Sequence, residues 1–159
     1  MKVKDVMSRR VAMVTLKTTF RDIGNIIFGK HPGQKFSSVP VVDKKGKLLG
    51  IVTEKDLLMQ LYPTQKEIIE DFFRTTNFSA MEEKIHEVEK LTAQQLMTES
   101  LSVVQQNTPL MKAGSLMLVK RVRRLPVVNK KGKLVGIISQ GDVFRAIFFH
   151  HCKFHTHRF

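Results

Sequence analysis

Two places in the sequence combine a hydroxyl side chain with a carboxylate three residues later. Thr53 precedes Asp56, and Ser139 precedes Asp142, in both cases immediately before an apolar run. This spacing is typical of a helix N-terminus, where the hydroxyl caps a backbone N–H group and the acid closes the cap. The exposed N–H groups and the positive end of the helix dipole can also hold an anion. An ionised carboxylate has more acceptor sites than one cap uses, so each pair could serve a ligand as well as its own helix.

The distribution of charge sets Asp142 apart. The 159 residues carry a formal charge of +13, which attracts polyanions. After Glu99, Asp142 is the only acid, although the last sixty residues contain eleven Lys and Arg. A lone carboxylate in so basic a segment is a candidate for a specific task. Nucleic-acid binding is the weaker explanation of the charge, because the chain has no Trp and one Tyr to stack on bases.

An internal repeat positions both pairs. Residues 39–56 recur as residues 125–142, with eleven of the eighteen pairs identical. In each copy two short apolar runs are joined by a Gly-containing turn, which predicts a β-hairpin that leads into the capped helix. Upstream, Met7-Ser8 aligns with Met97-Thr98.

Each copy also contains a helix before the hairpin. Thr19 and Thr108 are predicted N-caps, with Pro109 at the first helical position, and apolar residues follow at helical spacing. The order is therefore strand–helix–strand–strand–helix, an α+β unit. The first copy is longer in the loop 29–35. Between the copies, amphipathic helices are predicted over 67–74 and 81–91, and we expect this connector to pack on the repeats rather than to form a separate binding element.

These motifs resemble the CBS (cystathionine β-synthase) domain, and two in tandem resemble a Bateman module. The resemblance rests on Ser38–Asp43 and Gly50–Leu57 in the first copy and on Arg124–Asn129 and Gly136–Val143 in the second. It places CBS domain 1 at 1–62, a helical connector at 63–91, CBS domain 2 at 92–149 and a basic His-rich tail at 150–159. It implies pseudo-twofold packing of the copies and a non-catalytic regulatory module. Such a module binds AMP, ADP, ATP or S-adenosylmethionine in clefts between the copies, pairs into a homodimer, and can regulate a protein partner.

The resemblance also implies roles for individual residues. Asp56 and Asp142 match the acid that accepts hydrogen bonds from ribose hydroxyls, with Thr53 and Ser139 beside it. Arg123 and Arg124 match basic residues that reach phosphates, whereas the first copy has Ser37 and Ser38 there, so we expect the second copy to bind phosphate better. The predicted ligand-binding set is Met13, Ser38, Val39, Pro40, Thr53, Asp56, Val103, Arg123, Arg124, Leu125, Pro126, Ser139 and Asp142. Helix capping, a solvated basic face and ordinary core packing are the alternatives for these residues.

Other classes of function find little support in the sequence. It contains no phosphate-binding glycine loop, nucleophile elbow or zinc-protease motif, so we expect no catalysis and no required cofactor. The single Cys152 cannot form an internal disulfide, and no apolar run approaches the ~20 residues of a membrane span, which favours a cytoplasmic protein without membrane contact. A cluster of His and Cys near the C-terminus matches no closed zinc motif, so we predict no metal site there; its members are His150, His151, Cys152, His155 and His157. A basic nucleic-acid-binding module and an interaction subunit with empty clefts remain the alternatives.

Overall fold

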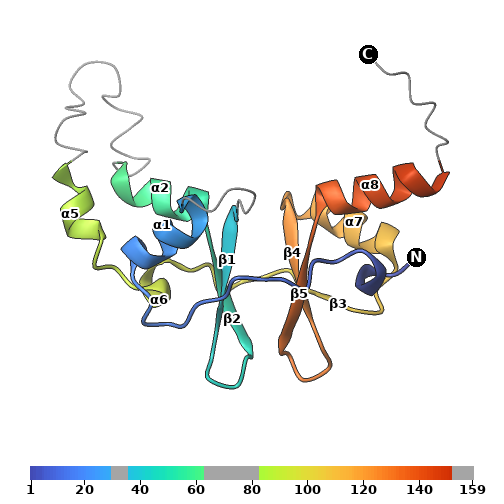
Figure 1. Ribbon diagram of the computed structural model, residues 1–159, viewed down its shortest axis with the longest axis horizontal. Coiled ribbons are helices and arrows are strands. Elements are labelled where there is room, and N and C mark those ends of the chain that lie inside the picture. The colour runs from blue at the N-terminus through green and yellow to red at the C-terminus, as the bar shows by residue number, and fades with distance from the viewer. Residues whose placement is uncertain (30–35, 63–82, 152–159) are drawn as a thin grey trace, which may run out of the picture. The chain divides into compact units, whose positions relative to one another are not determined.

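The chain forms two compact units, described by a computed structural model that covers residues 1–29, 36–62 and 83–151 (Figure 1). One unit comprises Ala12–Leu101, and the other combines Met1–Val11 with Ser102–Phe159. We call them the repeat-one unit and the repeat-two unit, after the sequence repeat whose hairpin each contains. Each mixes helices with a small sheet, which confirms the predicted α+β class.

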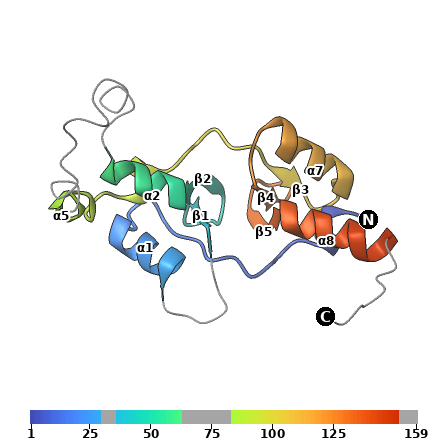
Figure 2. The same ribbon diagram turned by 90° about the horizontal axis from the view of Figure 1, so that it is seen from above.

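The repeat-two unit has the predicted order of elements. These are β3 (Val104–Gln105), α7 (Leu110–Val119), β4 (Arg124–Val128), β5 (Leu134–Ser139) and α8 (Gln140–His151). Strand β4 lies in the middle of the sheet, parallel to β3 and antiparallel to β5. Helices α7 and α8 lie side by side in both ribbon views and bury apolar side chains against the sheet (Figures 1 and 2).

The repeat-one unit has the same plan with a shorter first strand. Its elements are α1 (Phe20–Phe28), β1 (Ser38–Val42), β2 (Leu48–Thr53), α2 (Glu54–Leu61), α5 (Ile85–Val88) and α6 (Ala93–Leu96). The antiparallel β1–β2 pair carries an irregularity between Val41 and Val42, and β4–β5 carries the same one between Val127 and Val128. The first strand is reduced to a single parallel bridge between Val14 and Val41.

Each repeat places its N-terminal arm in the core of the other repeat's unit. The arm of the first repeat contains the short helix η1 (Val3–Asp5), and its Val3 and Met7 are buried with the β4–β5 core. The arm of the second repeat contains α6, and its Ala93 and Leu96 are buried with the β1–β2 core. Equivalent backbone hydrogen bonds hold both arms: Val3 N–H donates to Thr108 O at 2.9 Å, and Ala93 N–H donates to Thr18 O at 2.7 Å. The compact units therefore divide the chain differently from the sequence repeat.

Two glycines let these arms approach the strands. Ser8 bridges Ile137 of β5, and Thr98 bridges Ile51 of β2. A Cβ on Gly50 would lie 2.5 Å from Sδ, 2.9 Å from Cγ and 3.0 Å from Cβ of Met97, all of them side-chain atoms. A Cβ on Gly136 would lie 2.8 Å from Sδ of Met7 and 2.8 Å from the backbone oxygen of Ser8.

The turns of the two hairpins are built alike. Asp43 accepts hydrogen bonds at Oδ1 from the N–H groups of Lys45 (2.8 Å) and Lys47 (2.9 Å). The amide Oδ1 of Asn129 accepts the equivalent pair in the second hairpin, at 2.9 and 3.0 Å. Gly46 has φ of 79°, a conformation that few other residues adopt without strain. The bonds to Asp43, first that from Lys47, hold the pKa of its carboxyl below the ordinary value.

Several sequence predictions need correction or fall outside the described residues. Thr19 caps α1 as predicted, but α7 starts at Leu110 with Pro109 as its N-cap, while Thr108 instead accepts a bond from Gln105 N–H. Pro109 has extended ψ of 136°, so it stands before the helix rather than in it. A helix was predicted over 81–91. In the described part of that range, 83–91, α5 comprises only the four residues Ile85–Val88, so it is shorter than predicted. The loop residues 30–35, the helix over 67–74 and the tail from Cys152 lie outside the described residues.

We predict that Gly136→Ala destabilises the protein more than Gly50→Ala does. The added methyl at Gly136 meets backbone of the arm, which cannot swing aside, whereas at Gly50 it meets a methionine side chain. Gly136→Ala should lower the free energy of unfolding by about 1–3 kcal/mol, a typical cost of overpacking. Urea denaturation followed by circular dichroism measures both variants. An equal or larger loss in Gly50→Ala would contradict this account of the arm.

We predict that Asp43→Asn removes one contribution to the pH dependence of stability. Because folding lowers the pKa of Asp43, its contribution is present above the unfolded-state value of about 3.9 and is lost as pH falls through the lower folded value. Wild type should therefore exceed Asp43→Asn in stability at pH 7, and the difference should shrink by pH 3. Urea midpoints across this range measure it, and the reciprocal Asn129→Asp should gain the same dependence. A difference that stays constant with pH would refute the assignment.

Candidate functional site

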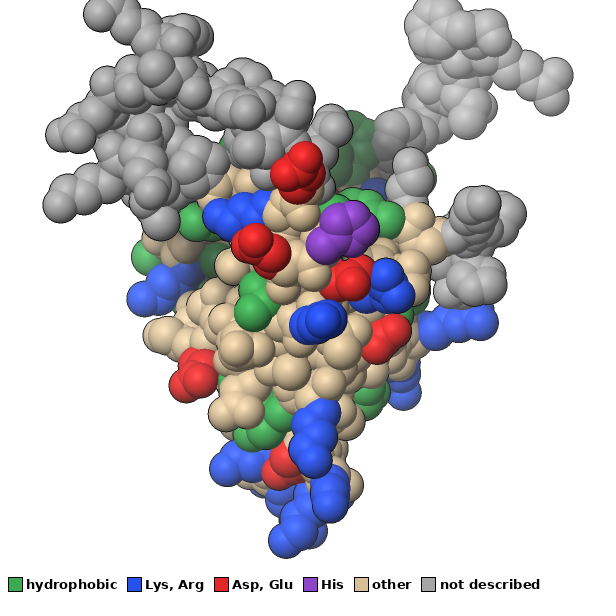
Figure 3. All heavy atoms as spheres, turned by 90° about the vertical axis from the view of Figure 1, so that its left-hand side faces the viewer, with side chains coloured by type: hydrophobic (Ala, Val, Ile, Leu, Met, Phe, Trp, Pro, Cys, Tyr) green, Lys and Arg blue, Asp and Glu red, His purple; other side chains and the backbone are tan. Residues whose placement is uncertain are grey.

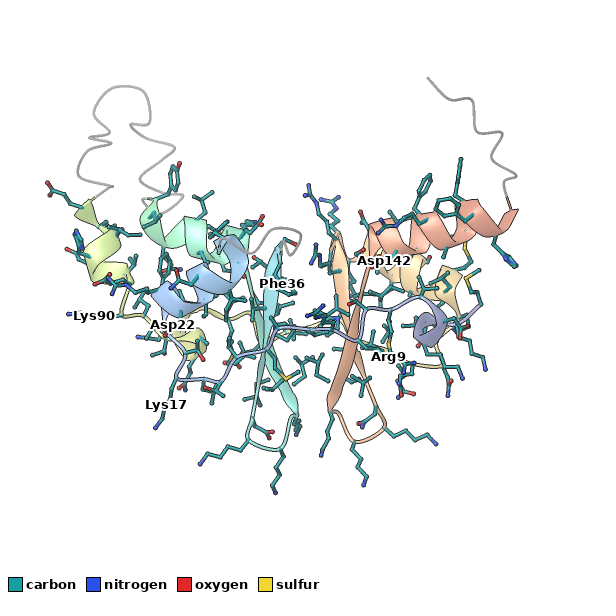
Figure 4. The ribbon with its side chains drawn as sticks, in the orientation of Figure 1. Arg9, Lys17, Asp22, Phe36, Lys90 and Asp142 are labelled. Atoms are coloured by element: carbon teal, nitrogen blue, oxygen red, sulfur yellow. The ribbon has the colours of Figure 1, made fainter. Side chains whose placement is uncertain are left out.

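The start of α8 brings Ser139 and Asp142 together at one corner of the repeat-two unit (Figure 4). Oδ2 of Asp142 accepts hydrogen bonds from Ser139 N–H at 2.9 Å and from the Ser139 hydroxyl at 2.6 Å. The hydroxyl oxygen in turn accepts from Asp142 N–H at 3.1 Å. The predicted capping box is therefore formed, and it engages only one of the two carboxylate oxygens.

The start of α2 repeats this geometry in the repeat-one unit. Oδ2 of Asp56 accepts from Thr53 N–H at 2.8 Å and from the Thr53 hydroxyl at 2.7 Å, while Asp56 N–H donates back at 3.2 Å. Among the described residues, no hydrogen bond reaches Oδ1 of Asp56. Both acids are partly buried, so each corner keeps a carboxylate oxygen at a helix N-terminus, as a ligand with hydroxyl donors requires.

The end of α7 fixes the position of Arg123 and Arg124. Arg121 takes a left-handed conformation (φ 53°), and Val122 N–H bonds to Met117 O at 3.0 Å, which turns the chain out of the helix. Gln140 then ties the next residues to the start of α8, since its N–H bonds to Arg123 O at 3.0 Å and its side-chain amide to Val122 O at 3.2 Å. Arg124 begins β4 opposite Ser139. Both arginines therefore emerge beside the Asp142 corner.

The equivalent position in the repeat-one unit carries no arginine. Ser38 begins β1 opposite Thr53, and Glu54 N–H bonds to Ser37 O at 3.2 Å, so the backbone follows the same path. Ser38 is buried, with 5% of its surface exposed. Among the described residues its Oγ has no hydrogen-bond partner, which costs about 1–3 kcal/mol for a buried hydroxyl. A ligand atom at this corner could satisfy it.

The sequence analysis missed Arg145 as a member of the repeat-two corner. Its Nη2 lies 3.1 Å from Oδ1 of Asp142, the oxygen that the cap does not use. The Arg145 side chain is 67% exposed, and such pairs on a helix surface contribute only about 0.3–0.5 kcal/mol. Arg145 can therefore change partner at little cost. The spacing of an acid and an arginine three residues apart on a helix was visible in the sequence and could have indicated the pair.

The predicted apolar contacts divide into two groups. Val39 and Leu125 are completely buried in the cores of their own units, and Pro40 and Pro126 beside them in the strands are also buried. A ligand would therefore meet backbone there rather than these side chains. Met13 and Val103 are 49% and 40% exposed and flank the sheets, since Val14 bridges β1 and Val104 belongs to β3. These two side chains are accessible to a flat apolar ring.

The most basic part of the repeat-one surface lies away from its corner. Lys44, Lys45 and Lys47 are exposed in the turn at the far end of the β1–β2 hairpin from Ser38 and Thr53. Figure 3 shows basic side chains gathered at this tip and acidic ones around α5. These lysines therefore play no part in the Asp56 corner.

The described residues give no sign of a metal site or a membrane span. In ranges 1–29, 36–62 and 83–151, no three His, Cys, Asp or Glu side chains come together in a way that could hold an ion. No helix in the same ranges has the length and apolar character needed to cross a bilayer. Three of the five clustered residues predicted not to bind metal lie beyond these ranges: Cys152, His155 and His157.

The chain belongs to the CBS domain family, which matches residues 3–62 and 93–148. Two matches in tandem, with the fold described above, make it a CBS pair, or Bateman module. The predicted family is therefore confirmed.

Relatives match between 70% and 94% of this chain. The protein MJ1426 of Methanocaldococcus jannaschii is 28% identical over 92% of this chain and 91% of its own length. CBSX1, a chloroplastic protein of Arabidopsis thaliana, is 32% identical over 70% of this chain, which spans only half of CBSX1. The crystal structure of CBSX2 in complex with AMP superposes with a TM-score of 0.71 at 30% identity, covering 94% of this chain and 97% of that chain.

Proposed function

We propose that this protein is a non-catalytic regulatory module that binds adenosine-type ligands at the Asp56 and Asp142 corners. The ligand classes are AMP, ADP or ATP and S-adenosylmethionine, taken up without any required cofactor. The cytoplasmic location stays a prediction, and so does the existence of a regulated protein partner.

One observation carries the proposal. Both repeats hold a partly buried carboxylate at a helix N-terminus, with one oxygen tied to the cap and the other outside it. A ribose presents two neighbouring hydroxyl donors that such an oxygen can accept. The free N–H groups of α2 and α8 favour an anion at the same corner. The exposed Met13 and Val103 offer apolar contact for a base.

The comparison with CBSX2 supports the same ligand class. That protein binds AMP in a crystal structure that resembles nearly the whole of this chain. A ligand that binds the folded unit and not the unfolded chain stabilises it, and preferential binding to one conformation shifts the population toward it. Regulation of a partner would follow from that shift.

We predict that AMP raises the thermal stability of the wild type and not that of the double variant Asp56→Asn/Asp142→Asn. At a free concentration of 100 times the dissociation constant, a bound ligand adds about 2.7 kcal/mol. Asparagine can still accept the cap hydrogen bonds but replaces the outer acceptor oxygen with a donor, so affinity should fall at least about tenfold. Differential scanning fluorimetry with millimolar AMP measures the shift.

Asp43→Asn is the matched control for this experiment. It makes the same chemical change at the far end of the β1–β2 hairpin, so its response to AMP should equal that of the wild type. If AMP stabilised the double variant as much as the wild type, the two carboxylates would serve only to cap their helices and would not bind the ligand. No response in the wild type to AMP, ADP, ATP or S-adenosylmethionine would remove the proposed function.

We also propose that the protein forms a homodimer. The helices of both units expose large apolar side chains: Met111, Leu118, Val119, Phe144 and Phe149 on α7 and α8, and Phe28, Leu58 and Met59 on α1 and α2. Phe144 stacks on Phe148 with ring centroids 5.2 Å apart while remaining 63% exposed. Clusters of exposed apolar residues are typical of protein interfaces.

We predict that Phe144→Glu converts the dimer to a monomer. A charge at the centre of an apolar interface would be desolvated without a partner, which is strongly unfavourable. Sedimentation velocity measures the mass of the wild type and the variant. Lys130→Glu, an exposed change in the β4–β5 turn, should leave the mass unchanged. A dimeric Phe144→Glu protein would place the interface elsewhere, and a monomeric wild type would exclude the homodimer.

A further inference from the structure

The two corners differ in charge at three matched positions. Around Asp142 stand Arg123, Arg124 and Arg145. The corresponding residues around Asp56 are Ser37, Ser38 and Met59. The repeat-two corner thus has three cationic side chains where the repeat-one corner has two hydroxyl groups and a thioether.

The first helical residue deepens this difference. Gln140 at the start of α8 is neutral, whereas Glu54 at the start of α2 is acidic and would repel an anion at the helix N-terminus. Lys55, which replaces Gly141, is the one described cation in the first turn of α2, and it is exposed. Among the described residues, the repeat-one corner therefore has little to offset the charge of a phosphate.

The repeat-two corner couples the sugar to the phosphate through Arg145. Oδ1 of Asp142, the oxygen outside the cap, already accepts a hydrogen bond from Arg145 at 3.1 Å, so a ribose hydroxyl shares this oxygen with the guanidinium unless Arg145 moves. A phosphate gives the guanidinium a better partner, because it can accept two parallel N–H bonds. Arg145 can then leave Oδ1 to the ribose. An uncharged nucleoside offers Arg145 no such partner, so its ribose has to share Oδ1 with the guanidinium.

The repeat-one corner has the opposite properties. No described residue occupies Oδ1 of Asp56, and the buried Ser38 Oγ lacks a partner, so a neutral ligand with hydroxyl or ring-nitrogen groups gains hydrogen bonds there without displacing an ion pair. The geometry points to a division of labour, an inference that rests on the proposed function. The repeat-two corner takes phosphorylated adenosine and the repeat-one corner takes an uncharged adenosine compound, with Arg145 as the residue that sets the difference.

The test measures AMP and adenosine binding to the full-length chain by isothermal titration calorimetry. In the wild type, AMP affinity should require Asp142 and fall with added salt, while adenosine affinity should require Asp56 and change little with salt. Asp142→Asn and Asp56→Asn assign each binding event to its corner. Arg145→Met should weaken AMP at the repeat-two corner about tenfold, the effect of losing one charge-assisted contact, and should leave adenosine at the repeat-one corner unchanged within about twofold.

The reciprocal variant tests sufficiency. Met59→Arg places the same cation three residues after Asp56 and should strengthen AMP at the repeat-one corner while weakening adenosine there. Both substituted side chains are more than half exposed, so neither change should disturb folding. Arg145→Lys, which keeps the charge and loses the planar fork, should lie between wild type and Arg145→Met.

The outcomes separate this inference from the proposed function. Binding of neither AMP nor adenosine to the wild type would overturn both. Binding that depends on the two acids, with the same AMP-to-adenosine ratio in wild type and Arg145→Met, would overturn the division of labour alone. A fall in both AMP affinity and adenosine affinity in Arg145→Met would show that the substitution disturbs the fold, and would overturn Arg145 as the residue that sets the difference.

Discussion

The packing of each N-terminal arm against the strands of the other repeat is the constraint on which the rest of the fold depends. Met7 lies over Gly136, and Met97 lies over Gly50, at distances that no side chain at the glycines would permit without movement. Val3 and Ala93 complete the two cores at the same time, and neither is exposed at all. Neither hairpin-and-helix set has a closed core made from its own repeat alone. Each unit therefore needs residues from both repeats. A substitution in either arm acts on the unit that contains the other repeat's hairpin and candidate site.

The candidate sites reuse groups that the fold needs in any case. The hydroxyl and the acid must meet to start α2 and α8, and the cap consumes one carboxylate oxygen. The other oxygen lies outside the cap, and in repeat two it accepts a hydrogen bond from Arg145, one turn further along α8. Stability and recognition are thus linked at one residue in each repeat.

Much of the fold followed from local patterns. The hairpins, their glycine turns, both capped helices and the α+β order are set by interactions between residues close in sequence, and these predictions were confirmed. The errors arose where local rules compete. Pro109 with Thr108 before it offers two plausible helix starts, and packing of Leu110 in the core decides between them. Of the residues at the candidate sites, the acids, the hydroxyl residues, Arg123 and Arg124 were predicted from the sequence, whereas Arg145 was not.

The sequence by itself determined the duplicated unit and the chemistry of each copy, because a motif repeated at a fixed offset specifies the same local structure twice. Only the tertiary structure decided which repeat each arm completes, since Met7-Ser8 and Met97-Thr98 match equally well whichever core receives them. It also decided which polar atoms are already satisfied. The bond between Arg145 and Asp142 and the orphaned hydroxyl of Ser38 depend on distance and burial, and residue types in a row specify neither.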